Sequence, residues 1–233
     1  ALRRRDQPTL GVATGSSPLG LYRALEQGIG LEGVRADRLF AFALDEYVGM
    51  PVDHPERYSN VVHREVTQRL GLAPQRVEVP GGSDGDPHVA AARYEERIES
   101  SGGIDVQILG IGNNGHIGFN EPGSSPDSRT RVVALAADTR RANARFFDNL
   151  SAVPTHAITQ GLGTIMQART IVLVAQGESK AAAVRRAVEG PVSSGCPGSI
   201  LQRHPDVTMI IDEAAASELD CRSQYRVAAS LRP

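Results

Sequence analysis

Short apolar runs alternate with polar loops and helix-like segments along the chain. Five runs are typical of buried strands: Thr9–Ala13, Leu39–Leu44, Ile104–Ile111, Thr170–Ala175 and Val207–Ile211. Continuous apolar strands separated by helical segments indicate a parallel sheet that is covered on both faces. The length of 233 residues fits one α/β domain, and we expect residues 1–233 to form it.

Polar residues follow four of these runs, at the points where the strands are expected to end. Ligands of such sheets bind outside the carboxyl ends of the strands, so the chemistry should be sought in the four segments together. These segments are Thr14–Ser17, Asp45–Tyr47, Asn113–Glu121 and Gly177–Lys180. One helix is expected to begin at Pro18 with Ser17 as its cap, and another to follow Lys180 and to end at Gly190.

The charge balance limits the classes of partner. Lys and Arg total 25 and Asp and Glu total 27, which gives a formal net charge of −2. We expect no nucleic-acid partner, because non-specific affinity requires many cations on phosphates. The basic run Arg3–Arg5 is interpreted as a solvated end. No apolar run reaches the roughly 20 residues that span a bilayer, so no membrane partner is expected either.

The two cysteines, Cys196 and Cys221, do not form a C-x-x-C pair. The sequence therefore gives no support for a disulfide framework or a zinc–thiolate site, and a reducing, cytoplasmic location is expected. No signal peptide is visible, although the chain begins at Ala1 rather than at a methionine.

The stretch Gly110–Pro122, GIGNNGHIGFNEP, contains a G-x-G-x-x-G pattern directly after a predicted strand. A dinucleotide site also needs a helix that begins at this loop and presents its N-terminus to the pyrophosphate. Pro122, Gly123 and Pro126 break any such helix. The glycines are therefore interpreted as permitting a tight turn, and no nucleotide or other cofactor is expected.

Metal and nucleophile motifs are not found either. His116 and Glu121 are five residues apart and the sequence has no H-E-x-x-H, so no metal is expected. Ser16 and Ser17 do not belong to a G-x-S-x-G motif. They are better interpreted as hydroxyl and N–H donors at a helix N-terminus, where an anion is stabilised.

A phosphate pocket is the interpretation that unites two of the loops. Ordinary helix capping explains Thr14, Gly15, Ser16 and Ser17 when that loop is taken alone. Lys180, however, also follows a strand at the start of a helix, beside Gly177 and Ser179. Two such loops on one edge of the sheet favour a site for a phosphate group.

Asp45 and His116 are candidates for proton transfer. Asp45 is expected to end a buried strand beside Glu46, and both desolvation and the like charge would raise its pKa and improve it as a base. His116 lies in a glycine-framed loop with Glu121, which could orient it or share its proton. Together with a phosphate pocket, these groups suit proton transfer on a sugar phosphate, such as aldose–ketose conversion.

Eight motifs follow one another over nearly the whole chain: TGSSPLGLYRAL, LDEYVGM, HPERYSN, GIGNNGHIGFNEPGSS, RTRVVAL, ADTRRANARFF, GESKAAAVRRAVEG and HPDVTMIIDEAAASEL. Together they resemble the glucosamine-6-phosphate deaminase family, also called glucosamine-6-phosphate isomerases. The combination of LDEY with GHIGFNEP is specific, because 6-phosphogluconolactonases of the same fold carry a different sequence after the Gly-His pair. The resemblance implies a three-layer, Rossmann-like α/β/α sandwich with a mainly parallel sheet.

The resemblance also implies an activity, the conversion of glucosamine 6-phosphate and water to fructose 6-phosphate and ammonia. Asp45 would move the C2 proton to C1 through an enolamine. His116 would open the sugar ring, with Glu121 holding its charge and orientation. The substrate phosphate would be bound by Thr14, Gly15, Ser16, Ser17, Arg145 and Lys180. Residues 138–150 would form a mobile lid that excludes water from the enolamine.

The chain departs from the family pattern beside His116 and at an effector site. Asn114 stands where some members have an aspartate, and an asparagine can orient His116 without sharing a negative charge with it. Ser124 and Arg131 match an allosteric site for N-acetylglucosamine 6-phosphate at a subunit interface. Val133 replaces the lysine of that site, so weak or absent activation is expected. The oligomeric state is left open: the protein could be a monomer, a hexamer or another homo-oligomer.

Two other functions fit the same residues. One is a 6-phosphogluconolactonase-like hydrolase, and the other is a non-catalytic sugar-phosphate sensor, which would not need Asp45, His116 and Glu121 together. The preference between the glucosamine and galactosamine epimers is also left open. The family begins with a strand and a helix ahead of Thr9, and only eight residues precede it here, so that element is expected to be missing.

Overall fold

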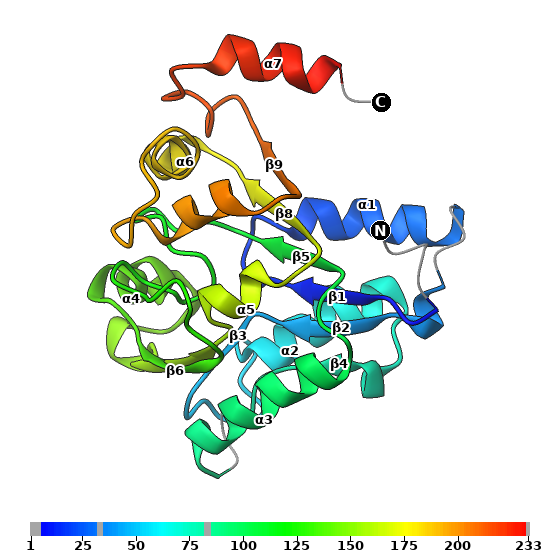
Figure 1. Cartoon of the computed structure of the whole chain (residues 1–233). Coiled ribbons are helices and arrows are strands. Elements are labelled where there is room, and N and C mark those ends of the chain that lie inside the picture. The colour runs from blue at the N-terminus through cyan, green and yellow to red at the C-terminus, as the bar shows by residue number, and fades with distance from the viewer. Residues whose placement is uncertain (1–5, 32–34, 82–84, 232–233) are drawn as a thin grey trace.

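Six parallel strands form the main sheet (Figure 1). The computed structural model describes residues 6–31, 35–81 and 85–231, so the Arg3–Arg5 run lies outside the described residues. The strand order is β4-β2-β1-β5-β8-β9, and each neighbouring pair is parallel. The five predicted strands are all present, joined by β4 at one edge. The bounds are β1 Thr9–Val12, β2 Phe40–Ala43, β4 Val77–Glu78, β5 Val106–Leu109, β8 Thr170–Ala175 and β9 Val207–Ile211.

Helices flank this sheet (Figure 1), and the predicted α/β/α sandwich with its parallel sheet is confirmed. None of the described helices is long and apolar enough to cross a membrane. The first helix begins at Leu19, one residue later than predicted, and the Pro18 carbonyl accepts from the Tyr22 N–H at 3.0 Å. The α-helices are α1 Leu19–Leu31, α2 Tyr58–Val62, α3 Pro87–Ser100, α4 Ala137–Asn143, α5 Leu162–Met166, α6 Ala181–Val188 and α7 Arg222–Ser230.

A second, antiparallel sheet lies beside the first and was not predicted. It consists of β3 Asp45–Tyr47, β6 Arg131–Ala134 and β7 His156–Thr159, in the order β3-β7-β6. Asp45 therefore opens a strand of this small sheet instead of ending a strand of the main one. The single residue Leu44 separates it from β2, and the Leu44 carbonyl accepts from the Gln160 N–H at 2.8 Å. This short connection joins the two sheets at the carboxyl edge of the main one.

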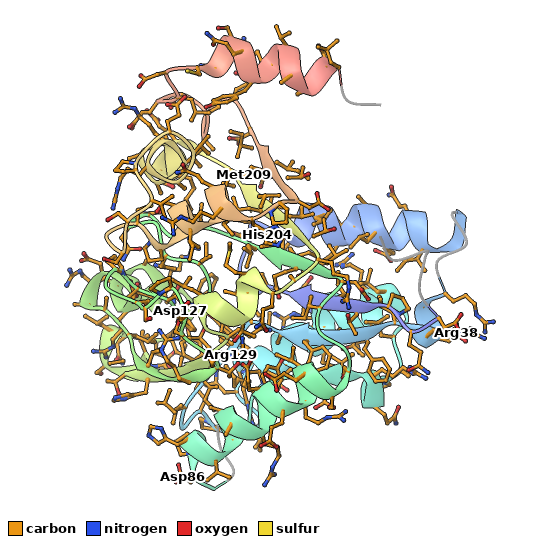
Figure 2. All side chains as sticks on the ribbon, viewed as in Figure 1. Arg38, Asp86, Asp127, Arg129, His204 and Met209 are labelled. Atoms are coloured by element: carbon orange, nitrogen blue, oxygen red, sulfur yellow. The ribbon has the colours of Figure 1, made fainter. Side chains whose placement is uncertain are left out.

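Glu95 ties the second sheet to helices on one side of the molecule. Its carboxylate accepts from the backbone N–H of Thr130 at 3.0 Å and from the Thr164 hydroxyl at 2.9 Å. Arg129, visible in Figure 2, pairs with Glu95 at 2.5 Å and with Glu99 at 2.7 Å. Because Glu95 and Glu99 belong to α3, these bonds hold the start of β6 against that helix.

Candidate active site

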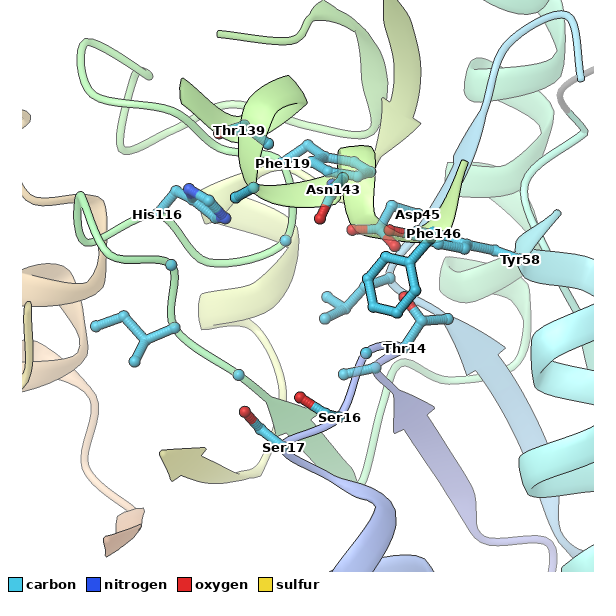
Figure 3. Close-up of a pocket in the computed structure, with 18 of the residues that line it drawn as sticks. Thr14, Ser16, Ser17, Asp45, Tyr58, His116, Phe119, Thr139, Asn143 and Phe146 are labelled. Carbon is cyan, nitrogen blue, oxygen red and sulfur yellow. The ribbon is translucent and has the colours of Figure 1, made fainter. Parts of the chain in front are cut away.

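A cavity of about 830 Å³ opens at the carboxyl edge of the main sheet, where the two sheets meet. Figure 3 shows His116, Asp45, Ser16 and Ser17 around it. Ser16 and Ser17 belong to the loop after β1, and Asp45 begins β3. The predicted residues that line it are Thr14, Gly15, Ser16, Ser17, Asp45, Asn114, His116, Arg145 and Lys180. Five segments that are far apart in the sequence therefore meet in one pocket.

The loop after β1 is held in place from inside the protein. The Tyr22 hydroxyl accepts from the backbone N–H of Ala13 at 3.0 Å and donates to its carbonyl at 2.8 Å, and this side chain is 1% exposed. Gly15 has a φ of 85°, a conformation that a glycine adopts without steric cost. The loop therefore turns tightly before α1 and leaves Ser16 at the pocket wall.

Two cations face the same part of the cavity. The Lys180 ammonium donates to Asn113 Oδ1 at 2.7 Å, and Arg145 lines the pocket from the segment after α4. Desolvation, and then the positive charge of Arg145, lower the pKa of Lys180. Two like charges held together in this way repel each other, and a dianion between them would relieve the repulsion.

Asp45 lines the same cavity and is buried, with 6% of its surface exposed. Desolvation and, to a smaller extent, the charge of Glu46 raise its pKa to about 8. Glu46 itself accepts the backbone N–H groups of Tyr47, Tyr58 and Ser59 at 2.8, 2.9 and 2.8 Å. The two adjacent carboxyl groups thus have different surroundings: one lines the cavity and the other caps the start of α2.

His116 is connected to Glu121 through Asn114. The Asn114 Oδ1 accepts from the backbone N–H of His116 at 3.1 Å and lies 2.7 Å from its ring Nδ1. The Asn114 Nδ2 donates to Glu121 Oε2 at 2.7 Å. These bonds orient the amide, so Nδ1 must be the donor to Oδ1. In the neutral ring Nε2 is then free to accept a proton.

Glu121 lies behind the histidine and is not part of the cavity wall. Its Oε2 is 3.6 Å from His116 Nδ1, and Asn114 makes the closer contact to each of them. Although desolvation opposes ionisation, the neighbouring His116 ring and hydrogen bonds from Thr139 and Asn114 lower the pKa of Glu121 to about 2. The carboxylate therefore stays ionised beside the imidazole ring.

The glycines of the G-x-G-x-x-G pattern make room for this arrangement. A Cβ atom on Gly112 would lie 2.1 Å from His116 Cε1 and 2.3 Å from its Nδ1. Gly115 has a φ of 90°, and a Cβ atom there would lie 2.5 Å from Cys196 Sγ. At these two positions the glycines serve the packing of the histidine loop, beyond the general need for a tight turn.

Helix α4 brings residues to the site that were not predicted from the sequence. The Thr139 hydroxyl donates to Glu121 Oε1, and the Asn143 amide donates to the Tyr47 hydroxyl at 3.1 Å. The Tyr58 hydroxyl also donates to that of Tyr47, at 3.3 Å. The four-residue spacing of Thr139 and Asn143, which puts two polar side chains on one face of a helix, was the signal that could have found them.

The residues matched to the family's effector site lie together, away from the cavity wall. Arg131 donates to Ser124 Oγ at 3.2 Å and to Asn120 Oδ1 at 2.9 Å. Val133 lies two residues further along β6, on the same side of the strand. Weak or absent activation by N-acetylglucosamine 6-phosphate remains a prediction.

Among the described residues, no three His, Cys, Asp or Glu side chains are grouped as metal ligands.

Comparisons with known sequences cover nearly the whole chain. The model of the family "Glucosamine-6-phosphate isomerases/6-phosphogluconolactonase" matches residues 1–210. Glucosamine-6-phosphate deaminase of Arthrobacter sp. (strain FB24) is 54% identical over 225 residues, which are 97% of this chain and 86% of that protein. The protein of the same name from Bifidobacterium longum (strain DJO10A) is 52% identical over 241 residues, covering 100% and 89% of the two chains.

Solved structures agree with these relatives. A monomeric glucosamine-6-phosphate deaminase superimposes with a TM-score of 0.89 at 42% identity, over 93% of this chain and 90% of that one. A 6-phosphogluconolactonase from Trypanosoma cruzi gives a TM-score of 0.74 at 21% identity, over 95% and 88% of the chains, which shows a shared fold. The chain belongs to the family of glucosamine-6-phosphate isomerases and 6-phosphogluconolactonases, and its relatives place it among the glucosamine-6-phosphate deaminases.

Proposed function

We propose that this protein converts glucosamine 6-phosphate and water to fructose 6-phosphate and ammonia. The observation that carries the proposal is the shared cavity. It combines a buried carboxyl group with a raised pKa, a histidine supported by Asn114 and Glu121, and two cations beside a hydroxyl-rich loop. The names of relatives that are more than 50% identical support the same substrate.

The phosphate would be bound first, at one end of the cavity. Lys180 and Arg145 would supply charge, and the N–H and hydroxyl groups of Gly15, Ser16 and Ser17 would supply hydrogen bonds. This anchoring fixes the sugar relative to Asp45 and His116. Fixed geometry of this kind accounts for a large part of the rate enhancement of many enzymes.

His116 would open the sugar ring. Its free Nε2 accepts the proton of the C1 hydroxyl, and the imidazolium returns a proton to the ring oxygen as the C1–O bond breaks. The aldehyde forms at C1 and no proton is gained or lost overall. The ionised Glu121, acting through Asn114, stabilises the imidazolium that exists between the two transfers.

Asp45 would then move the proton between carbon atoms. Its carboxylate takes the C2 proton and the C1–C2 double bond forms. The C1 oxygen takes a proton from the substrate's own ammonium group, which gives the enolamine. Return of the proton to C1 leaves a C2–N double bond, which water attacks. Ammonia leaves and the C2 carbonyl of fructose 6-phosphate remains.

A coupled assay for ammonia and fructose 6-phosphate tests the proposal, with Asp45→Asn as the control for background activity. Release of both products in equal amounts by the wild type alone is expected. Hydrolysis of 6-phosphogluconolactone without ammonia release would instead indicate a lactonase. Binding of glucosamine 6-phosphate without any product would indicate a sensor. A parallel assay with galactosamine 6-phosphate determines the epimer preference.

A further inference from the structure

The lid helix α4 presents two polar side chains to the active site from one face. Thr139 and Asn143 are four residues apart in α4, which places them one above the other on the same side of the helix. Thr139 is only 5% exposed, although α4 is otherwise largely exposed. In the view of Figure 3, Thr139 lies on the side of His116 and Asn143 on the side of Asp45.

Thr139 contacts the carboxylate that supports the histidine. Its hydroxyl donates to Glu121 Oε1, while the Asn114 amide donates to Oε2 at 2.7 Å. One oxygen of Glu121 is therefore held by the histidine loop and the other by the lid. A carboxylate that accepts from both sides has one favoured rotamer, and the bond to Thr139 exists only while α4 packs against the loop.

Asn143 makes the corresponding contact with the strand that carries the base. Its amide donates to the Tyr47 hydroxyl at 3.1 Å, and Tyr47 is the last residue of β3, which begins with Asp45. Phe147 packs edge-on against the same tyrosine ring, with centroids 5.9 Å apart. These contacts fix the position of α4 relative to both halves of the catalytic machinery, so Thr139 reaches Glu121 in a defined geometry.

We propose that Thr139 is a positioning residue that makes the His116–Asn114–Glu121 chain complete only when the lid is packed onto the site. Closing the lid excludes water from the cavity, and through Thr139 the same motion orders the group that supports the imidazolium. Ring opening is thereby confined to the closed, protected state. The inference rests on the proposed function for its kinetic consequences, and on the Thr139–Glu121 bond for its structural ones.

Two variants of Thr139 separate the hydroxyl group from the shape of the side chain. Thr139→Val keeps the branched shape and removes the donor, whereas Thr139→Ser keeps the donor. We expect Thr139→Val to lower kcat for glucosamine 6-phosphate by about 10-fold or more, because a hydrogen bond to a charged group is lost, with KM changed by less than about 2-fold. Thr139→Ser should stay within about 3-fold of wild type in both constants.

A double-mutant cycle tests whether Thr139 acts through Glu121. In a Glu121→Ala background the further change Thr139→Val should cause no additional loss, because the acceptor is already absent. Arg141→Gln is the matched lid control, since Arg141 is an exposed residue of α4 that pairs with Asp138, and it should not change kcat. An equal loss in both backgrounds, or a rise in KM alone, would overturn the proposal.

A measurement that does not depend on turnover separates this inference from the proposed function. The pH titration of the His116 Cε1–H resonance should move to lower pH in Thr139→Val and be unchanged in Thr139→Ser, because the supporting carboxylate is less ordered only in the first. If wild type releases no ammonia yet the titration moves, the proposed function fails and the positioning role stands. If wild type is active and Thr139→Val matches it in kcat and in the titration, only this inference is wrong.

Discussion

The imidazole ring of His116 rests against the backbone of Gly112 so closely that a methyl group there would lie 2.1 Å from Cε1. A real side chain at this position would force the ring, the loop, or both to move. The ring is in turn bonded to Asn114, which leaves it little freedom to rotate away. The second glycine of the G-x-G-x-x-G pattern is therefore required by the histidine four residues later.

Gly112→Ala should consequently reduce activity more than stability. We expect kcat to fall by about 100-fold or more, because small displacements of a catalytic group have effects of that size. Gly20→Ala is the control: this residue lies in α1 with open space around its Cα, so the change should leave kcat unaltered and raise stability by about 0.5–1 kcal/mol. Kinetics and thermal melts of both variants check this, and a fully active Gly112→Ala would contradict it.

The raised pKa of Asp45 predicts the pH dependence of activity. Desolvation and Glu46 raise this pKa to about 8, and a base must be ionised in order to accept the C2 proton. The value of kcat/KM should therefore decline as the pH falls below about 8. Asp45→Asn should lower kcat by about 100- to 10,000-fold while inorganic phosphate still binds. A rate that is constant from pH 8 to pH 6 would exclude this role.

The same pKa predicts a gain in stability when the charge is removed. An aspartate ionises near pH 3.9 in an unfolded chain, so between about pH 4 and pH 8 the folded protein retains a proton that the unfolded chain loses. Stability must then fall as the pH rises through this range. Asp45→Asn should have a higher Tm than wild type at pH 8–9 and the same Tm near pH 4. Identical melts at pH 9 would contradict the prediction.

Asn114→Asp should change the ionisation of the histidine. A carboxylate in contact with Nδ1 adds a second negative charge beside that of Glu121 and stabilises the imidazolium. We expect the corresponding limb of the kcat/KM profile to move to higher pH. Profiles that superimpose would show that the amide already provides all the support that the ring needs.

Lys180→Met should weaken phosphate binding with little effect on the chemistry. The loss of one charge-assisted contact should raise KM for glucosamine 6-phosphate by roughly 10- to 100-fold. Arg185→Met is a matched control, because Arg185 is an exposed cation one helical turn further along that pairs with Asp220 at 2.8 Å. Inhibition by inorganic phosphate provides the second measurement, and an unchanged inhibition constant for Lys180→Met would contradict the assignment.

Much of the main sheet could be predicted because its strands are buried on both faces. Runs such as Thr170–Ala175 carry the signal in their composition alone, and polar residues mark their ends. The same reasoning placed the loop Thr14–Ser17 and Lys180 at one edge of the sheet, and both line the cavity there. The strand β3, by contrast, consists of Asp45, Glu46 and Tyr47, whose polar character gives no sign of a strand. The other strands of this sheet, β7 and β6, have four residues each, too few to show a period.

Contacts between helix α4 and the site could not be predicted for a different reason. Thr139 and Asn143 are ordinary polar residues in a helix, and their role depends on where α4 packs. Asn114 was recognised as a departure beside His116, but its place between the ring and Glu121 depends on a loop conformation that only the three-dimensional structure reveals. Tertiary contacts, and not local preferences, determine this part of the site.

The two sheets meet at a short connection through Leu44, and each carries a different part of the proposed chemistry. The loop proposed to bind the phosphate follows a strand of the main sheet, and Asp45, the proposed base, belongs to the small one. Substitutions in the small sheet and its loops would change the reaction and leave the hold on the phosphorylated end of the substrate intact. A fold divided in this way can keep one class of substrate while its chemistry changes, and its family includes both isomerases and lactonases.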